Sequence, residues 1–334
     1  MRKELKKTIL CTSALIGLAG ALGVTYHITL QKLMKVALDR EEPKQIARSK
    51  KKISSSGDVS SLLSICSAAG EKLRNKVHKK ITITGNDGVK LVGHWYCPEN
   101  PKRVIIAMHG WRSSWCQDFG LIADFWLNNG CAVLFAEQRA QGDSGGDYMG
   151  FGLLERYDCY DWINWVNSHT NSSLPIYLGG ISMGATTVLM TAGFELPKNV
   201  CGIIADCGFT SPNAIWKHVV QNNLHIPFGI YAGVAKELCR KRINMSSDEY
   251  STTQALADSK IPILFIHGTE DNFVPINMTY ENYKACGSKK HLLIVPGAGH
   301  GMSYILDKQG YEKAVAKLWA ENDSMKENTD SADN

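Results

Sequence analysis

The sequence predicts an α/β fold in which a mostly parallel central sheet carries helices on both faces. Short apolar runs alternate with segments of helical periodicity between residues 103 and 319, as expected for strands that are buried on both faces. An alternating pair of runs around Gly85-Asn86-Asp87-Gly88 comes first and indicates an antiparallel hairpin. The third observation is Gly180-Ile181-Ser182-Met183-Gly184, which stands between an apolar run and a helical one.

Length and composition fit a globular protein with one large core or two modest ones, and they exclude several function classes. The chain has 334 residues, of which 44% are hydrophobic and 21% charged, as in ordinary globular proteins. The net charge of +5 is small, and much of it comes from the first eighty residues, so we expect no nucleic-acid partner. The ten cysteines form no Cys-x-x-Cys pair. We therefore expect free buried thiols, no metal site and no cofactor.

The N-terminal region predicts attachment to a membrane. Residues 1–7 are basic, and residues 8–30 contain no charged side chain apart from the titratable His27. At about 1.5 Å per residue this run can cross a hydrocarbon layer of ~30 Å, so we predict an uncleaved single-pass transmembrane anchor in the cell membrane. A cleaved signal peptide is the alternative, because Ala19-Gly20-Ala21 resembles a cleavage site. Basic residues flank the run on both sides, which leaves the side of the membrane open.

The remaining elements follow in order. A basic, helix-prone linker is expected over residues 31–78, the main domain over 79–322, and a polar tail over 323–334. After the hairpin strands at 81–84 and 89–96, buried strands are predicted at 103–108, 131–136, 176–178, 200–205, 261–266 and 291–295. Helical spacing covers 114–129, 157–166, 185–190, 278–285 and 311–319. Residues 207–260 exceed one crossover helix, and we predict that they form a small helical cap.

Ser182 is the predicted nucleophile. A chain that leaves a strand and enters a helix at once must turn sharply, and glycines fit the crowded positions that flank the turn. The turn exposes the serine hydroxyl above the sheet and places the N–H of Met183 at the start of the helix, where positive partial charge gathers. Such a turn is typical of acyl-transfer enzymes, although a purely structural serine fits the five-residue pattern alone.

The partners of Ser182 are expected at the carboxyl ends of other strands. His300 stands in Gly297-Ala298-Gly299-His300-Gly301 after the last strand, where a histidine has no evident packing role. Asp271 follows the preceding strand and is the expected acid, with Glu270 and Asp206 as alternatives. The order Ser, Asp, His is the one expected when a histidine base activates a serine on such a sheet.

Two further groups complete the predicted site. The N–H of Trp111, in the loop after the 103–108 strand, is expected to join that of Met183 in an oxyanion hole, while Ser113 or Ser114 caps the following helix. Within the cap, Trp216, Phe228 and Tyr231 are expected to line an acyl or side-chain pocket. Ordinary packing of these aromatic residues on the sheet is the alternative.

These residues together resemble the α/β-hydrolase superfamily, and more closely the membrane-anchored bacterial group related to the Bacillus protein YqkD. The likeness covers the anchor and about residues 79 to 320. Its motifs are His109-Gly110, Arg139 with Gly142 and Ser144-Gly145-Gly146, Gly180 to Ala185, His267-Gly268 with Asp271 and Val274-Pro275, and His300 to Tyr304. The resemblance implies the α/β-hydrolase fold and Ser182, Asp271 and His300 as the triad. Ala140 departs from the pattern, but only in a supporting loop.

The resulting hypothesis is a membrane-anchored serine hydrolase that cleaves carboxylic esters or thioesters of a small-molecule or acylated substrate. A serine peptidase of the prolyl-oligopeptidase type is the first alternative, although residues 31–78 are too short for the propeller domain that such peptidases usually carry. A catalytically silent binding protein on the same fold is the second. The sequence determines neither the substrate nor the oligomeric state.

Overall fold

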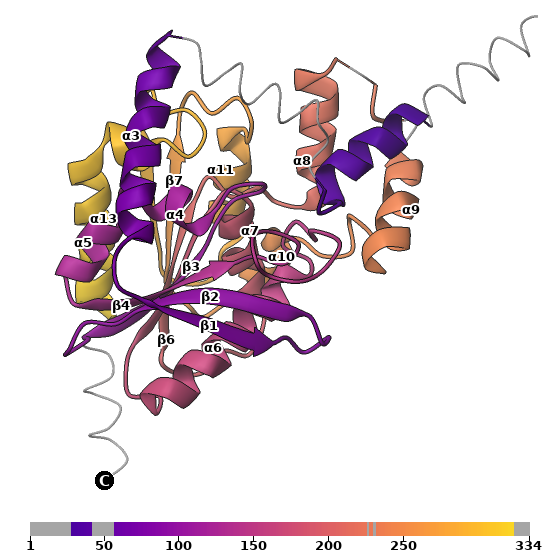
Figure 1. The fold of residues 1–334 in the computed structure, drawn as a ribbon. Coiled ribbons are helices and arrows are strands. Elements are labelled where there is room, and N and C mark those ends of the chain that lie inside the picture. The colour runs from indigo at the N-terminus through magenta and orange to yellow at the C-terminus, as the bar shows by residue number, and fades with distance from the viewer. Residues whose placement is uncertain (1–27, 42–56, 226, 230–231, 324–334) are drawn as a thin grey trace, which may run out of the picture.

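The central sheet has eight strands and is mostly parallel. The structure is a computed structural model and describes residues 28–41, 57–225, 227–229 and 232–323 (Figure 1). Within these residues the strand order is β1-β2-β4-β3-β5-β6-β7-β8, with β2 antiparallel to both β1 and β4 and every other neighbouring pair parallel. The strands are β1 (Lys79–Thr84), β2 (Lys90–Tyr96), β3 (Arg103–Met108), β4 (Cys131–Glu137), β5 (Ile176–Ile181), β6 (Val200–Asp206), β7 (Ile263–Gly268) and β8 (Lys290–Val295). The predicted parallel sheet and its N-terminal hairpin are confirmed.

Helices cover both faces of this sheet. Their bounds are α3 (Gly57–Arg74), α4 (Trp115–Phe119), α5 (Ala123–Asn128), α6 (Glu155–Thr170), α7 (Met183–Thr191), α8 (Pro212–His218), the π-helical turn η1 (Val219–Asn223), α9 (Ala232–Ile243), α10 (Thr252–Ala257), α11 (Ile276–Ala285), α12 (Ser303–Leu306) and α13 (Lys308–Asn322). Residues 28–38 are also helical. One expected helix, 114–129, is divided into α4 and α5. The chain turns there around Gly120, where an added Cβ would collide with the backbone of α3 at Ala69 and Gly70.

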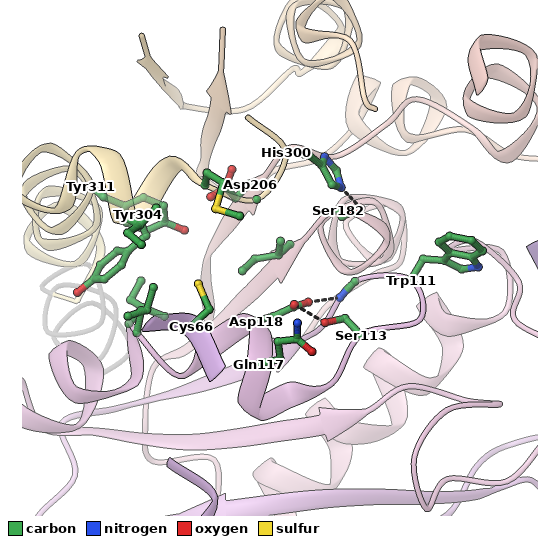
Figure 2. Close-up of a pocket in the computed structure, with 17 residues that line it drawn as sticks. Cys66, Trp111, Ser113, Gln117, Asp118, Ser182, Asp206, His300, Tyr304 and Tyr311 are labelled. Atoms are coloured by element: carbon green, nitrogen blue, oxygen red, sulfur yellow. Dashed lines mark hydrogen bonds between the residues drawn. The ribbon is translucent and has the colours of Figure 1, made fainter. Parts of the chain in front are cut away.

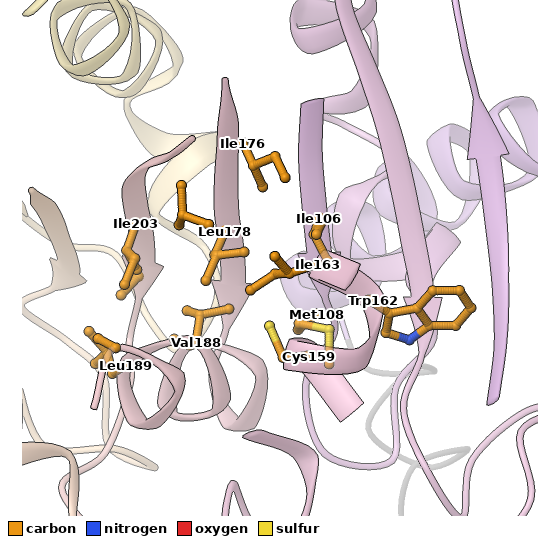
Figure 3. Close-up of a cluster of buried hydrophobic side chains, with 14 of the residues drawn as sticks. Ile106, Met108, Cys159, Trp162, Ile163, Ile176, Leu178, Val188, Leu189 and Ile203 are labelled. Carbon is orange, nitrogen blue, oxygen red and sulfur yellow. The ribbon is translucent and has the colours of Figure 1, made fainter. Parts of the chain in front are cut away.

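Two hydrophobic layers fix the sheet. Along β3, Val104, Ile106 and Met108 contribute to the layer under α6, α7 and α10, whereas Ile105 and Ala107 contribute to the layer under α4, α5 and α13. Figure 3 shows the first layer, with strand residues such as Ile106 facing α6 and α7. Successive strand residues point to opposite faces, so a strand covered on both sides must be apolar at every position. This two-sided burial explains the continuous apolar runs in the sequence.

A third hydrophobic cluster joins the N-terminal region to the cap. Leu30, Met34 and Leu38 are only 2%, 3% and 0% exposed, and they pack with residues of α8, η1 and α9. Figure 1 shows the indigo helix 28–38 beside α8 and α9. The α10 helix of the predicted cap region packs instead against α7 and the sheet. The three-dimensional cap therefore consists of α8, η1, α9 and the helix 28–38.

The region before residue 79 is more closely packed than a linker. Its two described helical segments both contact the domain, helix 28–38 at the cap and α3 beside α4. Most of the predicted anchor, residues 8–27, lies outside the described residues, as does the tail from residue 324. Within the described ranges, no helix combines the length and apolar character needed to cross a membrane.

Candidate active site

Ser182 lies at the sharp turn between β5 and α7. Its backbone adopts φ 56° and ψ −118°, a conformation that costs a non-glycine residue on the order of 1–3 kcal/mol. A Cβ on Gly180 would collide with the backbone of Gly184, and one on Gly184 would collide with the carbonyl of Met108. The N–H of Ser182 donates to the carbonyl of Asp206 on β6 at 2.9 Å. The turn thus requires both glycines, and the neighbouring strand holds it in place.

The structure brings Ser182, His300 and Asp271 together from three separate loops. His300 Nε2 lies 2.9 Å from Ser182 Oγ, and His300 Nδ1 lies 2.7 Å from Asp271 Oδ2. Figure 2 shows the imidazole of His300 directed at Ser182. With Nδ1 donating to the carboxylate, the neutral ring presents an acceptor to the serine hydroxyl. This is the geometry required for a base that takes the serine proton.

The environment of Asp271 keeps its carboxyl ionised. Burial opposes ionisation, but hydrogen bonds from His267, His300 and the N–H of Val274 outweigh it and hold the pKa of Asp271 well below its usual range. Its Oδ1 accepts from the N–H groups of Phe273 and Val274 at 2.9 and 2.8 Å. The loop after β7 therefore fixes Oδ1, while His267 of β7 and His300 contact Oδ2. A fixed negative charge here orients His300 and stabilises its protonated form.

The two alternative acids have other environments. Glu270 has an exposed side chain, and its backbone N–H bonds to the carbonyl of Ala298. Asp206 is fully buried and accepts from the hydroxyl of Ser303 at 2.9 Å. Burial raises the pKa of Asp206 to about 6, although the Ser303 hydrogen bond favours the ionised form. Asp206 thus supports the loop that carries His300, while Asp271 makes the direct contact.

The loop after β3 approaches Ser182 closely. An added Cβ on Gly110 would lie 3.4 Å from the Cβ of Ser182. The Asp118 carboxylate in α4 holds this loop by accepting from the N–H of Gly110 at 2.6 Å and from the hydroxyl of Ser113. Ser114 caps α4 through the N–H of Gln117, as one of the two predicted caps.

The expected oxyanion donors remain available for a ligand. Among the described residues, no protein acceptor is recorded for the backbone N–H of Trp111 or of Met183. Met183 begins α7, where the first N–H groups have no partner within the helix. One predicted donor thus lies at the first residue of α7, next to Ser182 in the chain, and the other lies in the loop after β3 that approaches Ser182.

No pattern in the sequence indicated the contact between this loop and helix 28–38. Arg112, which has φ 50°, donates through Nη2 to the carbonyls of Val36 and Asp39 at 2.8 and 2.6 Å. The indole Nε1 of Trp111 donates to the carbonyl of Ala37 at 2.9 Å. A guanidinium at a helix C-terminus satisfies carbonyls that have no partner within the helix. The end of helix 28–38 is thus bonded directly to the loop that presents the Trp111 N–H.

A cavity of about 220 Å³ opens at Ser182 and His300. Its walls come from sequence-distant elements: Cys66 from α3, Gln117 from α4, Tyr304 from α12 and Tyr311 from α13. Figure 2 shows these side chains on one side of Ser182 and the indole of Trp111 on the other. Sequence reasoning missed all four residues, because nothing in their local pattern indicates proximity to Ser182.

The predicted pocket residues lie elsewhere. Trp216 and Phe228 line a second, apolar cavity beneath the cap and belong to its hydrophobic cluster. Neither lines the cavity at Ser182, so their role in an acyl or side-chain pocket stays a prediction. They face the second cavity because α8 packs against helix 28–38, a contact that a sequence assignment to a linker does not anticipate. Tyr231 lies outside the described residues.

One group near the triad has metal-ligand residue types. Ligand atoms of Cys207, Asp271 and His300 lie within 4.8 Å of one another. Burial, followed by the charge of Asp206, raises the pKa of the Cys207 thiol well above its usual value. Metal binding needs a thiolate, and both ring nitrogens of His300 already have partners. The group therefore fits a hydrogen-bonded triad beside a buried thiol better than a metal centre.

Comparisons with known proteins agree with this architecture. The family described as X-Pro dipeptidyl-peptidase (S15 family) matches residues 87–256, and the family described as TAP-like protein matches residues 227–327. YqkD of Bacillus subtilis is 26% identical over 243 residues, covering 73% of this chain and 78% of YqkD. YfhR of Escherichia coli K12 is 25% identical over 232 residues, covering 66% of this chain and 73% of YfhR.

Solved structures share the fold. The Pyrococcus furiosus esterase Pf2001 aligns with a TM-score of 0.59 at 22% identity, covering 75% of this chain and 95% of the esterase. The structure of DcsB in complex with its substrate analogue aligns with a TM-score of 0.58 at 17% identity, covering 74% of this chain and 99% of DcsB. These likenesses establish an α/β-hydrolase fold. Since the S15 profile also matches half of the chain, the protein belongs to the X-Pro dipeptidyl-peptidase (S15) family within the α/β-hydrolase superfamily.

Proposed function

We propose that this protein is a membrane-tethered serine hydrolase that cleaves carboxylic esters or thioesters through an acyl-enzyme on Ser182. The observation that carries the proposal is the continuous hydrogen-bonded series from Asp271 through His300 to Ser182, at 2.7 and 2.9 Å. A serine hydroxyl is a weak nucleophile by itself. A base in hydrogen-bond contact, oriented by an ionised acid, provides the activation that acyl transfer needs.

The reaction follows from the positions of these groups. His300 Nε2 accepts the proton of Ser182 as its Oγ attacks the carbonyl carbon, and the N–H groups of Met183 and Trp111 stabilise the resulting oxyanion. The imidazolium then gives its proton to the leaving alcohol or thiol, which leaves the acyl group on Ser182. A water molecule enters, His300 removes its proton, and the second tetrahedral intermediate releases the acid.

The membrane part of the proposal rests on the sequence before residue 28. Helix 28–38 takes Leu30 into the cap, so the apolar run that remains is residues 8–27. At about 1.5 Å per residue these positions still reach ~30 Å, the thickness of a hydrocarbon layer. A span that ended there would place the cap directly at the membrane surface, where esters of lipids and other apolar acyl compounds concentrate.

The test is labelling of the full chain with a fluorophosphonate probe. Labelling is expected in the parent and in Ser168→Ala, an exposed serine on α6, and is expected to disappear in Ser182→Ala and His300→Ala. The full chain is needed because helix 28–38 contacts the loop of Trp111. A parent that folds but does not react would contradict the proposal. Reporter fusions on either side of the membrane would separately test the anchor.

A peptidase is the second candidate, because the matching family is described by X-Pro dipeptidyl-peptidase activity. Its chemistry would use the same Ser182, His300 and Asp271, so labelling does not separate the two. A panel of acyl esters and of Xaa-Pro amides does, through kcat/KM on each. Turnover of amides with the efficiency of esters would favour the peptidase.

A further inference from the structure

We propose that the apolar cavity beneath the cap is the acyl-chain subsite of this enzyme and that the N-terminal helix 28–38 forms one of its walls. The proposal rests on the proposed function and adds a substrate class to it, esters of medium or long unbranched acyl chains. It also assigns a role in substrate binding to a helix outside the predicted hydrolase domain.

The cavity has the chemistry of a hydrocarbon site. Its volume is about 340 Å³, and every lining side chain is apolar. Helix 28–38 provides Leu33, Met34 and Ala37, and α8 and η1 face them with Ile215 and Val219. Cavities that bind small ligands begin near this size. A charged substrate group would lose its hydration here without gaining a charged partner among the lining side chains.

Two aromatic residues connect this cavity to the reacting groups. Trp111 lines both the apolar cavity and the cavity at Ser182. Phe273 lines the apolar cavity, stacks on Trp111 with ring centroids 6.4 Å apart, and lies 5.1 Å from the ring of His300. An acyl chain that extends past Trp111 would therefore place its carbonyl carbon toward Ser182 and its tail in the apolar cavity.

The position of Trp111 gives the subsite a direction. Figure 2 shows its indole on the far side of Ser182 from Tyr304 and Tyr311. The cavity on the tyrosine side contains the polar side chains of Gln117 and Asp118. We therefore assign the tyrosine side to the leaving group and the cap side to the acyl chain.

The experiment compares ester hydrolysis by the full chain and two tryptophan variants, all in phospholipid nanodiscs. Leu33→Trp narrows the cavity, while Lys35→Trp adds the same side chain to an exposed position on the same helix. The substrates are p-nitrophenyl esters of acetic, butanoic, hexanoic and octanoic acid. Because partitioning into lipid is the same for every variant, the ratio of kcat/KM between variants at each chain length isolates the cavity.

Burial of one methylene group corresponds to about a fourfold gain in kcat/KM. We expect Leu33→Trp to lose at least about tenfold more on the octanoyl ester than on the acetyl ester, whereas Lys35→Trp follows the parent at every length. Val219→Trp, on the cap side, serves as a second variant if Leu33→Trp does not fold. Fluorophosphonate labelling of each variant reports whether Ser182 is still active.

The outcomes separate the two proposals. If both variants are labelled but kcat/KM depends on acyl chain length in the same way for Leu33→Trp and Lys35→Trp, the proposed subsite is wrong, while the proposed hydrolase activity is still supported. If the parent is not labelled, the proposed hydrolase falls, and binding of a dansylated undecanoic acid decides the cavity alone. Equal fluorescence binding by Leu33→Trp and Lys35→Trp would then overturn the acyl-binding site as well.

Discussion

Replacement of Arg112 by glutamine tests whether the N-terminal helix positions the oxyanion loop. The guanidinium donates to the carbonyls of Val36 and Asp39 through contacts of 2.6 to 3.0 Å, and it adjoins Trp111, the expected oxyanion donor. Glutamine keeps polarity at the position but cannot bridge both carbonyls. We therefore expect the end of helix 28–38 to detach more often and the loop to lose its fixed position.

The hydrogen bonds of Arg112 set the size of the expected effect on kcat. Hydrogen bonds from charged groups contribute on the order of 1.5–3 kcal/mol each, and since Arg112 is half-exposed we assign its set a total of about 2 to 4 kcal/mol. That free energy corresponds to about a 30- to 900-fold increase in opening of this segment. Loss of a whole oxyanion donor costs about 10²- to 10³-fold in kcat. A displaced but present Trp111 N–H should cost less, so we expect kcat to fall about 10- to 100-fold.

Hydrogen exchange measures detachment of the end of helix 28–38, and enzyme kinetics separately measures the loss of kcat. The N–H of Met149 donates to the carbonyl of Leu38, and that of Arg40 donates to the carbonyl of Asp147, so both amides report detachment of the segment. Their exchange should accelerate in Arg112→Gln. The matched control is Arg242→Gln, which removes the 2.7 Å ion pair with Asp39. Within the described part of the chain, the side chain of Arg242 bonds to Asp39 and to the carbonyl of Leu238, and not to the oxyanion loop.

The control decides the interpretation. Arg242→Gln should accelerate exchange of the same amides while leaving kcat within about threefold of the parent, since the ion pair is partly exposed and contributes little. If both variants lower kcat equally, the activity depends on docking of the helix and not on Arg112 at the loop. If Arg112→Gln accelerates exchange and leaves kcat unchanged, the reasoning about the oxyanion loop is refuted.

Three further predictions follow from the site and the fold. Asp271→Asn should lower kcat on an acetyl ester by about 10³- to 10⁴-fold, because the amide favours the wrong tautomer of His300. Glu270→Gln should lower kcat less than threefold. The reverse ranking would mean that Glu270, and not Asp271, is the acid that orients His300. Burial raises the pKa of Asp206 to about 6 from 3.8, so the folded state binds more protons than the unfolded state between these values and stability falls as pH rises through the window. The free energy of unfolding of Asp206→Asn minus that of the parent should therefore rise by up to about 3 kcal/mol between about pH 4 and about pH 8. Urea denaturation measures this difference, and a difference that does not change with pH would contradict the raised pKa. Gly184→Ala should abolish the folded protein, since its Cβ would collide with a β3 carbonyl, whereas Gly233→Ala on α9 meets open space and should raise the melting temperature slightly; equal circular-dichroism melting curves would refute the distinction.

The sheet was predictable because its strands are covered on both faces. Continuous apolar runs located β3 to β8 to within a few residues, and the alternating pattern around Gly85 to Gly88 located the hairpin. The strand β8, expected to be buried, is only partly buried because it lies at the edge of the sheet. Helix bounds were less accurate. The expected helix at 114–129 is interrupted at Gly120, because α3 approaches there from a segment assigned to a linker. Periodicity records which residues of a helix are buried, but not where another helix crosses it.

The three residues of the hydrogen-bonded triad were predictable for a different reason. In a parallel sheet the carboxyl ends of the strands lie at one edge, so Ser182, Asp271 and His300 had to lie near one another once their strands were assigned. The choice of Asp271 over Glu270 needed only one further fact, the direction of each side chain. The structure supplies it through the 2.7 Å contact with His300 and the exposed position of Glu270.

The sequence by itself determined the layered α/β sheet, the turn at Ser182 and the strand ends that hold its partners, because these depend on local periodicity and on small residues at fixed spacing. Only the tertiary structure decided which surfaces enclose the site. Cys66 lines the cavity at Ser182, and helix 28–38 bonds to Arg112 in the loop of Trp111, although both Cys66 and this helix lie far from Ser182 in the sequence. Their contacts are set by packing between elements, which no local pattern encodes, and the position of the apolar cavity follows from the same packing.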